Sequence, residues 1–171
     1  CIASKGHEVV GVDLNARTVK LVNSGQLPEH EPGIEDLLQK SNGRLRAISD
    51  TKEAVLESAV TLVIVPTPSD SSGVFSTQYV LEACERIARG LSAKPDYHLV
   101  VIVSTVMPGS TEKEIRRKIE EVSGKKCGAD FGLCYVPSFI ALGSVVRDFL
   151  SPDYLLVGES DQKAGDLVME L

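Results

Sequence analysis

Polar residues of the kinds that bind ligands stand at or just after the ends of three apolar runs in this sequence. They are Asp13, Thr67 and the pair Ser104-Thr105. Each apolar run is typical of a buried strand that stops at a polar turn, as the strands of an open parallel sheet do. Ligands bind beside the carboxyl ends of such strands. The sequence therefore predicts a ligand-binding sheet edge that carries these side chains.

Asp13 has the chemistry to bind a ribose. A carboxylate at the end of the second strand of a dinucleotide fold accepts hydrogen bonds from both ribose hydroxyls, and it repels the 2′-phosphate of NADP. The glycine-rich turn that completes such a site is expected about 20 residues upstream, and the sequence does not contain it. Because an aspartate before a helix is also a common cap, Asp13 is a candidate ligand of NAD with capping as the alternative.

Two further turns are candidate ligand contacts. Val65, Pro66, Thr67 and Pro68 form a rigid turn that leaves the backbone open to a ligand, although prolines also simply stiffen connections. The second turn begins at Ser104-Thr105 and leads into a helix that starts near residue 110. The exposed N–H groups of a helix start favour polar or anionic ligands. The alternative for this turn is that its hydroxyl groups only cap the helix.

The segment 135–158 is expected to be a loop that wraps around something at the sheet edge. It contains two proline turns, a Gly-Ser pair and the pair Arg147-Asp148. Neighbouring charges of this kind usually form a local ion pair. We therefore expect a structural role for the pair, with a catalytic role as the alternative.

Strands and helices alternate along the chain, which is typical of βαβ units and a parallel sheet. The fold class predicted is α/β, a doubly wound, three-layer, Rossmann-like parallel sheet, with residues 1–171 forming one domain. The expected strands are 7–14, 45–48, 61–65, 99–103, 132–136 and 154–157. The expected helices are 16–24, 34–39, 51–58, 76–90, 110–121 and one from 161.

The two ends of the sequence both suggest interrupted helices. Residues 1–6 are typical of a last helical turn that stops at Gly6, and 165–171 of a helix cut short. We therefore expect an N-terminally truncated domain that lacks its first strand and glycine-rich turn.

Composition argues against several classes of partner. The net charge is −6 and no basic cluster occurs, since Lys, Arg and Glu alternate in 112–126; this disfavours nucleic acid. No apolar run approaches the ~20 residues of a membrane span, and no signal peptide is recognisable. The four cysteines lack zinc-site spacing, so no metal is expected and reduced, packed thiols are predicted.

Five segments in order resemble the amino-terminal half of the nucleotide-sugar 6-dehydrogenases, which oxidise UDP-glucose, GDP-mannose and relatives. They are GHEVVGVD, NSGQLPEHEPGIEDLL, VPTPSD, STVMPGST and PSFIALGSVVRDFLSPDYLLVGE. The resemblance implies two NAD-dependent hydride transfers at C6 of the sugar, a covalent intermediate on a cysteine outside this sequence, a homodimer and a cytoplasmic location. The chain alone is expected to be inactive. Alternatives are a dehydrogenase of the 3-hydroxyacyl-CoA or 6-phosphogluconate type and a non-catalytic binding module.

The resemblance also implies roles for individual positions. Asp13 matches the ribose-binding acid; Val65, Pro66, Thr67 and Pro68 match the turn over the adenine side and pyrophosphate; Ser104 and Thr105 match the turn near the nicotinamide; Leu142 is expected at the cofactor. Ser138, Phe139, Ile140 and Ala141 are expected at the substrate, and Thr105 and Ser138 are the candidate catalytic positions. The sequence departs from the family where Val136 and Ser138 replace asparagine and glutamate. Glu31, in the EPG loop, is expected to be mainly structural.

Overall fold

The computed structural model describes residues 1–27, 30–69, 71 and 73–171, and these divide into two compact units. Unit 1 comprises Cys1–Ala54 and Phe139–Leu155, and unit 2 comprises Val55–Ser138 and Leu156–Leu171. The expectation that residues 1–171 form one domain therefore stays a prediction. Among the described residues, no helix is long and apolar enough to cross a membrane.

Unit 1 is built on a two-stranded parallel sheet in which β1 pairs with β2 from Val9↔Leu45 to Val12↔Ile48. The Asn23 side chain, at the end of α1, donates to the Ala47 carbonyl oxygen and accepts from the Ala47 N–H. This amide therefore satisfies backbone groups that β1 leaves free. The elements of unit 1 are a 3₁₀ turn Ala3–Lys5 (η1), β1 Val9–Val12, α1 Ala16–Asn23, α2 Ile34–Ser41, β2 Leu45–Ile48 and α6 Val145–Leu150.

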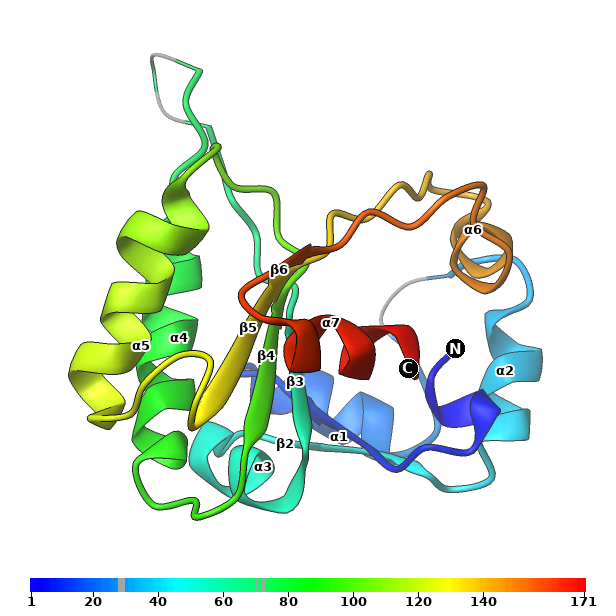
Figure 1. Ribbon diagram of the computed structural model, residues 1–171. Helices are drawn as coiled ribbons and strands as arrows, with labels where there is room; N and C mark the ends of the chain where they lie inside the picture. Colours follow the sequence, from blue (N-terminus) through cyan, green and yellow to red (C-terminus); the bar gives the residue numbers. More distant parts are fainter. Residues whose placement is uncertain (28–29, 70, 72) are drawn as a thin grey trace. The chain divides into compact units, whose positions relative to one another are not determined.

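Unit 2 contains a four-stranded sheet with helices on both faces (Figure 1). Helices α4 and α5 cover one face and α7 covers the other, so the predicted three-layer, doubly wound arrangement is confirmed in this unit. Helix α3, Thr51–Glu57, spans the boundary between the units. The elements of unit 2 are β3 Val60–Val63, α4 Gln78–Leu91, β4 His98–Ile102, a π turn Thr111–Ile115 (η2) that continues into α5 Arg116–Ser123, β5 Phe131–Tyr135, β6 Gly158–Glu159 and α7 Gln162–Met169.

Strand β4 is the centre of the unit 2 core, and all five of its residues are buried. Val100 and Ile102 face the helices α4 and α5, whereas Leu99 and Val101 face α7. This explains why residues 99–102 of the strand are continuously apolar rather than alternating. The thiols of Cys84 and Cys134 are packed into these two layers, and burial raises their pKa to about 12 and about 11.

Gly132 allows α7 to approach the sheet closely. A Cβ at this position would lie 2.8 Å from the Ala164 Cβ and would also collide with the Tyr97 hydroxyl. Because the strand has no side chain here, Ala164 of α7 can pack directly on β5.

Two expectations for the last third of the chain were wrong. The apolar run 154–157 is not a strand: β6 is Gly158–Glu159, and it pairs antiparallel with β5 through Tyr135↔Gly158. Tyr154, Leu155 and Leu156 are exposed, so their apolar character does not indicate a buried strand. The segment 135–158 is also not all loop, because α6 forms within it; a helix of six residues is too short to show periodicity.

Candidate functional site

The carboxyl ends of three strands of unit 2 lie side by side, as the apolar runs predict. Val63 pairs with Ile102, and Ile102 pairs with Tyr135, so β3, β4 and β5 end in the same row. Thr67, the pair Ser104-Thr105, and Ser138 follow these ends. The sheet therefore brings residues of three predicted contact segments to one edge.

The Ser104 side chain connects two of these segments. Its hydroxyl donates to the Val65 carbonyl oxygen at 2.7 Å and approaches the Val63 carbonyl oxygen at 3.3 Å. The Ser104 N–H also donates to the Val63 oxygen, at 3.1 Å. Ser104 is buried whereas Thr105 is exposed. The Ser104 proton is thus used within the protein, and of the two hydroxyls that of Thr105 is the one open to a ligand.

The turn after β3 continues into a loop that is closed by backbone contacts. Ser69 and Phe75 form an isolated antiparallel bridge, and the Ser76 N–H donates to the Pro68 carbonyl oxygen at 3.0 Å. Thr67, which precedes this closed loop in the chain, is partly exposed. The last residue of the VPTPSD segment, at position 70, lies outside the described residues.

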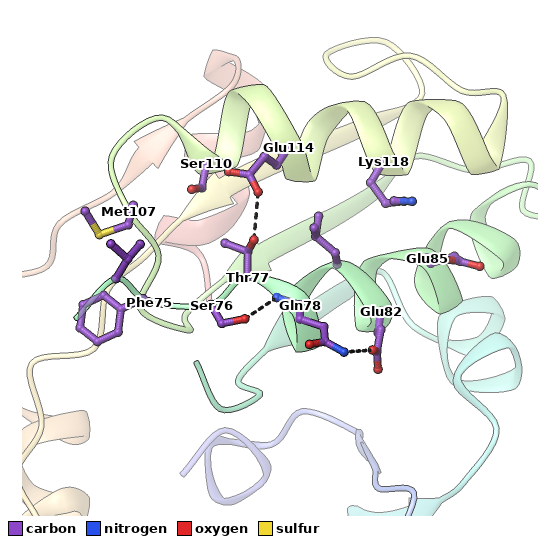
Figure 2. A pocket seen from close by; sticks show the side chains of 12 residues that line it. Phe75, Ser76, Thr77, Gln78, Glu82, Glu85, Met107, Ser110, Glu114 and Lys118 are labelled. Atoms are coloured by element: carbon purple, nitrogen blue, oxygen red, sulfur yellow. Dashed lines mark hydrogen bonds between the residues drawn. The ribbon is translucent and has the colours of Figure 1, made fainter. Parts of the chain in front are cut away.

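An open groove of about 660 Å³ lies between the start of α4 and the helix formed by η2 and α5 (Figure 2). The Thr77 hydroxyl donates to a Glu114 carboxylate oxygen at 2.9 Å and links the two walls. Phe75 and Met107 lie at one end of the groove. None of the predicted site residues lines it, and its mixture of acidic, basic and apolar side chains selects no ligand chemistry.

In unit 1, Asp13 directly follows β1 and has one carboxylate oxygen to spare. Its N–H donates to the Ile48 carbonyl oxygen at 3.2 Å, and its Oδ1 accepts from the Asn15 N–H at 2.7 Å. Asn15 in turn caps α1 by accepting from the Arg17 N–H. Among the described residues, none donates a hydrogen bond to Oδ2 of Asp13, and the side chain is partly exposed. Asp13 thus shapes the turn into α1 and still offers an acceptor.

The predicted substrate-contacting residues Phe139, Ile140 and Ala141 are exposed, and Leu142 is 96% exposed. The Phe139 ring packs against Tyr154 with centroids 4.6 Å apart. These residues belong to unit 1, while Ser138 is the last residue of its segment in unit 2. Arg147 and Asp148 form the expected local ion pair, at 2.9 Å. Hydrogen bonds from Ser144 and Arg147 lower the pKa of Asp148.

Two buried polar groups have hydrogen-bond partners that the sequence did not suggest, although Glu31 was expected to be structural. Glu31 is buried, and its carboxylate accepts from the Gly143 and Val145 N–H groups. His98 is also buried, with Nε2 2.8 Å from the Thr61 hydroxyl, and burial together with Lys94 lowers its pKa to about 4. Local patterns give no signal for either contact, because the partners lie 37 to 114 residues away.

Comparison with known proteins identifies close relatives. The model of the UDP-glucose/GDP-mannose dehydrogenase family, NAD binding domain, matches residues 1–171. A GDP-mannose 6-dehydrogenase from Pseudomonas aeruginosa is 39% identical over the whole chain, and a UDP-glucose 6-dehydrogenase from Haloferax volcanii is 38% identical. The chain spans about 40% of the length of each.

Solved structures agree with these matches. The crystal structure of a ternary complex of GDP-mannose dehydrogenase from Pseudomonas aeruginosa superimposes with a TM-score of 0.96 at 39% identity, covering 99% of this chain and 39% of that one. A UDP-glucose dehydrogenase from the archaeon Pyrobaculum islandicum gives a TM-score of 0.91 at 35% identity, covering 98% of this chain and 39% of that one. The similarity therefore extends over both compact units.

Proposed function

We propose that this chain, which belongs to the UDP-glucose/GDP-mannose dehydrogenase family and corresponds to its NAD binding domain, supplies the cofactor-binding part of a nucleotide-sugar 6-dehydrogenase. The enzyme would oxidise the C6 alcohol of a nucleotide sugar to a carboxylate in two hydride transfers. Membership of this family removes the 3-hydroxyacyl-CoA and 6-phosphogluconate alternatives. The observation that carries the proposal is the family match along the whole chain, supported by the shared row of strand ends in unit 2.

The chain's residues fit NAD. Asp13 follows a parallel strand, is partly exposed and keeps Oδ2 available, which suits the hydroxyls of a ribose. Val65, Pro66, Thr67 and Pro68 would hold the pyrophosphate side, and the Ser104 hydroxyl holds the Val65 carbonyl oxygen at the start of this turn. When bound, NAD supplies the hydride acceptor.

Among the described residues, the two proposed for the reacting end, Thr105 and Ser138, can form hydrogen bonds, but neither side chain is a base. Thr105 is exposed and would hydrogen-bond the nicotinamide or the sugar. Ser138 stands where the family has a glutamate, and a serine hydroxyl does not act as a general acid or base near neutral pH. Ser138 would therefore position a ligand by hydrogen bonding, and proton transfer would depend on residues outside this chain or be slow.

The substrate class is a nucleotide sugar, because the relatives at 39% and 38% identity act on GDP-mannose and UDP-glucose respectively. These nearly equal identities do not choose between the two sugars. Phe139, Ile140 and Ala141 would line the sugar side, and Leu142 would contact the cofactor. The proposal also includes a homodimeric, cytoplasmic enzyme of polysaccharide biosynthesis, without nucleic-acid or membrane partners; the chain alone would not complete the reaction.

The test is a turnover assay on the complete enzyme that carries this chain. NAD is supplied with GDP-mannose, UDP-glucose and an N-acetylated UDP-sugar in separate reactions, and NADH formation is followed with product analysis. The proposal expects two NADH for each uronic acid formed from one of these sugars. NAD binding without oxidation of any nucleotide sugar would instead favour a non-catalytic binding module, which is the reading that Val136 and Ser138 support.

A further inference from the structure

We infer that Glu31 is a positioning residue for residues 141–145, a stretch in which the proposed function places Ala141 beside the sugar and Leu142 beside the cofactor; the inference rests on that function. The Glu31 side chain is only 7% exposed. One carboxylate oxygen accepts from the Gly143 N–H at 3.1 Å and the other from the Val145 N–H at 2.8 Å. All of these groups belong to unit 1. Because both oxygens are occupied and buried, Glu31 acts through the backbone that it holds.

The sequence around Glu31 fixes the direction of its side chain. The Ile34 N–H donates to the Glu31 carbonyl oxygen at 3.1 Å, which closes a four-residue turn. Pro32 occupies the second position of the turn, and Gly33 occupies the third with φ +82° and ψ 1°. These are the residues and angles of a type II turn, where the third position requires positive φ. Gly33 lies next to α6: a Cβ added to this glycine would be 3.7 Å from the Val146 side chain.

The stretch that donates these hydrogen bonds is itself a tight turn. The Ser144 N–H donates to the Ala141 carbonyl oxygen at 3.1 Å, and Gly143 has φ +89°. Asp148 holds the same turn from the other side, because one of its oxygens accepts from the Ala141 N–H at 3.3 Å and from the Ser144 hydroxyl at 2.5 Å. The N–H groups of residues 141, 143, 144 and 145 are thus all bonded within the protein.

Leu142 lies at the apex of this turn, where the surrounding hydrogen bonds fix its position. Its side chain is 96% exposed although it is apolar. Two carboxylates, Glu31 and Asp148, hold the backbone on either side of it. A loop ordered before binding does not lose conformational entropy when a ligand arrives, so its affinity is higher than that of a loose loop. Glu31 therefore keeps Leu142 and its neighbours in a conformation ready to meet the ligand.

The first test measures the turn without any ligand. Amide hydrogen exchange is followed at Gly143 and Val145 in the wild type, in Glu31→Gln and in the control Glu35→Gln. Glu35 is an exposed acid on α2 that contacts His30. Glu31→Gln keeps the side-chain shape but replaces one acceptor by an NH₂ group, so exchange at these two amides should rise roughly tenfold. Unchanged protection at both amides would overturn the inference.

A second variant keeps the inference testable if Glu31→Gln does not fold. Gly33→Ala retains the carboxylate but strains the positive φ of the type II turn that aims it. It should loosen the Gly143 and Val145 amides in the same direction, while Gly43→Ala, at another positive-φ glycine in unit 1, should not. Equal effects of the two glycine variants on these amides would contradict the inference.

The second readout connects the turn to the ligand. In the complete enzyme, Glu31→Gln should raise the KM for the nucleotide sugar roughly tenfold while kcat changes less than about threefold, as expected for lost preorganisation. Faster amide exchange with an unchanged KM would overturn the positioning role. If the wild type neither binds NAD nor oxidises any nucleotide sugar, the proposed function fails, and the exchange data still decide whether Glu31 orders the turn.

Discussion

The Ser104 hydroxyl donates to the Val65 carbonyl oxygen at 2.7 Å and thereby connects the turn after β4 to the turn after β3. Both turns are predicted contacts of one extended cofactor. A buried hydroxyl that satisfies a neighbouring strand's carbonyl oxygen keeps the two turns in a fixed relation. The edge of the sheet is therefore ordered by the protein itself.

Replacement of Ser104 by alanine should destabilise unit 2 by about 1–2 kcal/mol, because the partly buried Val65 carbonyl oxygen loses the hydrogen bond from the Ser104 hydroxyl. The exposed neighbour provides the control: Thr105→Ala should change the free energy of unfolding by less than about 0.5 kcal/mol. Urea denaturation of the two variants measures both values. Equal losses in the two variants would show that the Ser104 bond does not order this edge.

The buried His98 predicts a dependence of stability on pH. Its pKa is lowered to about 4 in the fold, from an ordinary value of 6.5, by burial and the nearby Lys94. Below pH 6.5 the unfolded chain binds the proton more readily than the folded chain, so stability falls until the pH reaches about 4. The maximum loss is about 3 kcal/mol. Above pH 6.5 this loss of stability is absent, because His98 is then neutral in both the folded and the unfolded chain.

The measurement compares urea unfolding at pH 7 and pH 5 in the wild type and in His98→Phe. The variant also leaves the Thr61 hydroxyl without its His98 partner, so the slope with pH is compared and not the absolute stability. The wild type should lose more free energy of unfolding than the variant between these pH values. Parallel slopes would indicate that His98 does not titrate as described.

Ser138→Glu should increase turnover of the complete enzyme. General acid–base catalysis contributes roughly 10²–10⁴-fold where a group is well placed, and Ser138 is exposed at the end of β5. We therefore expect a rise in kcat of at least about tenfold. Ser123→Glu, on the distant end of α5, is the control. No gain from Ser138→Glu would show that this position does not limit the reaction.

The strand ends and the alternation of elements could be predicted because they depend on local residue patterns. The run before Ser104 is continuously apolar because β4 is buried on both faces. The run 154–157 has the same composition but is exposed, and nothing local separates the two cases. Pairing with β5 decides the location of β6, and that is a long-range property.

The places of the candidate site residues at strand ends were predictable, whereas their hydrogen-bond partners were not. Asp13 and Thr105 retain exposed polar groups, as their positions suggest. Ser104 was expected to face a ligand, but its proton is used by a carbonyl oxygen 39 residues away in sequence. Glu31 was expected to be structural, and its partners lie 112 and 114 residues further along the chain. Such contacts follow from packing, which spacing alone does not reveal.

The central claim, that Asp13 is the ribose ligand of NAD, has a matched control in the same unit. Asp50 also follows a parallel strand of unit 1, and its Oδ1 accepts from the Lys52 and Glu53 N–H groups at the start of α3. Asp13→Asn and Asp50→Asn both keep the side-chain shape and an acceptor for the local turn. They therefore separate the loss of a cofactor contact from the loss of a cap.

The decisive measurement is the dissociation constant of NAD, by isothermal titration calorimetry, for the complete enzyme and these two variants. Asp13→Asn should weaken NAD binding roughly tenfold or more and narrow the preference over NADP, because a charge-assisted bond to ribose is lost and repulsion of the 2′-phosphate disappears. Asp50→Asn should leave the constant within about twofold, since Asp50 is exposed and is not among the proposed contacts of the cofactor. Equal weakening by both variants, or none by Asp13→Asn, would contradict the assignment.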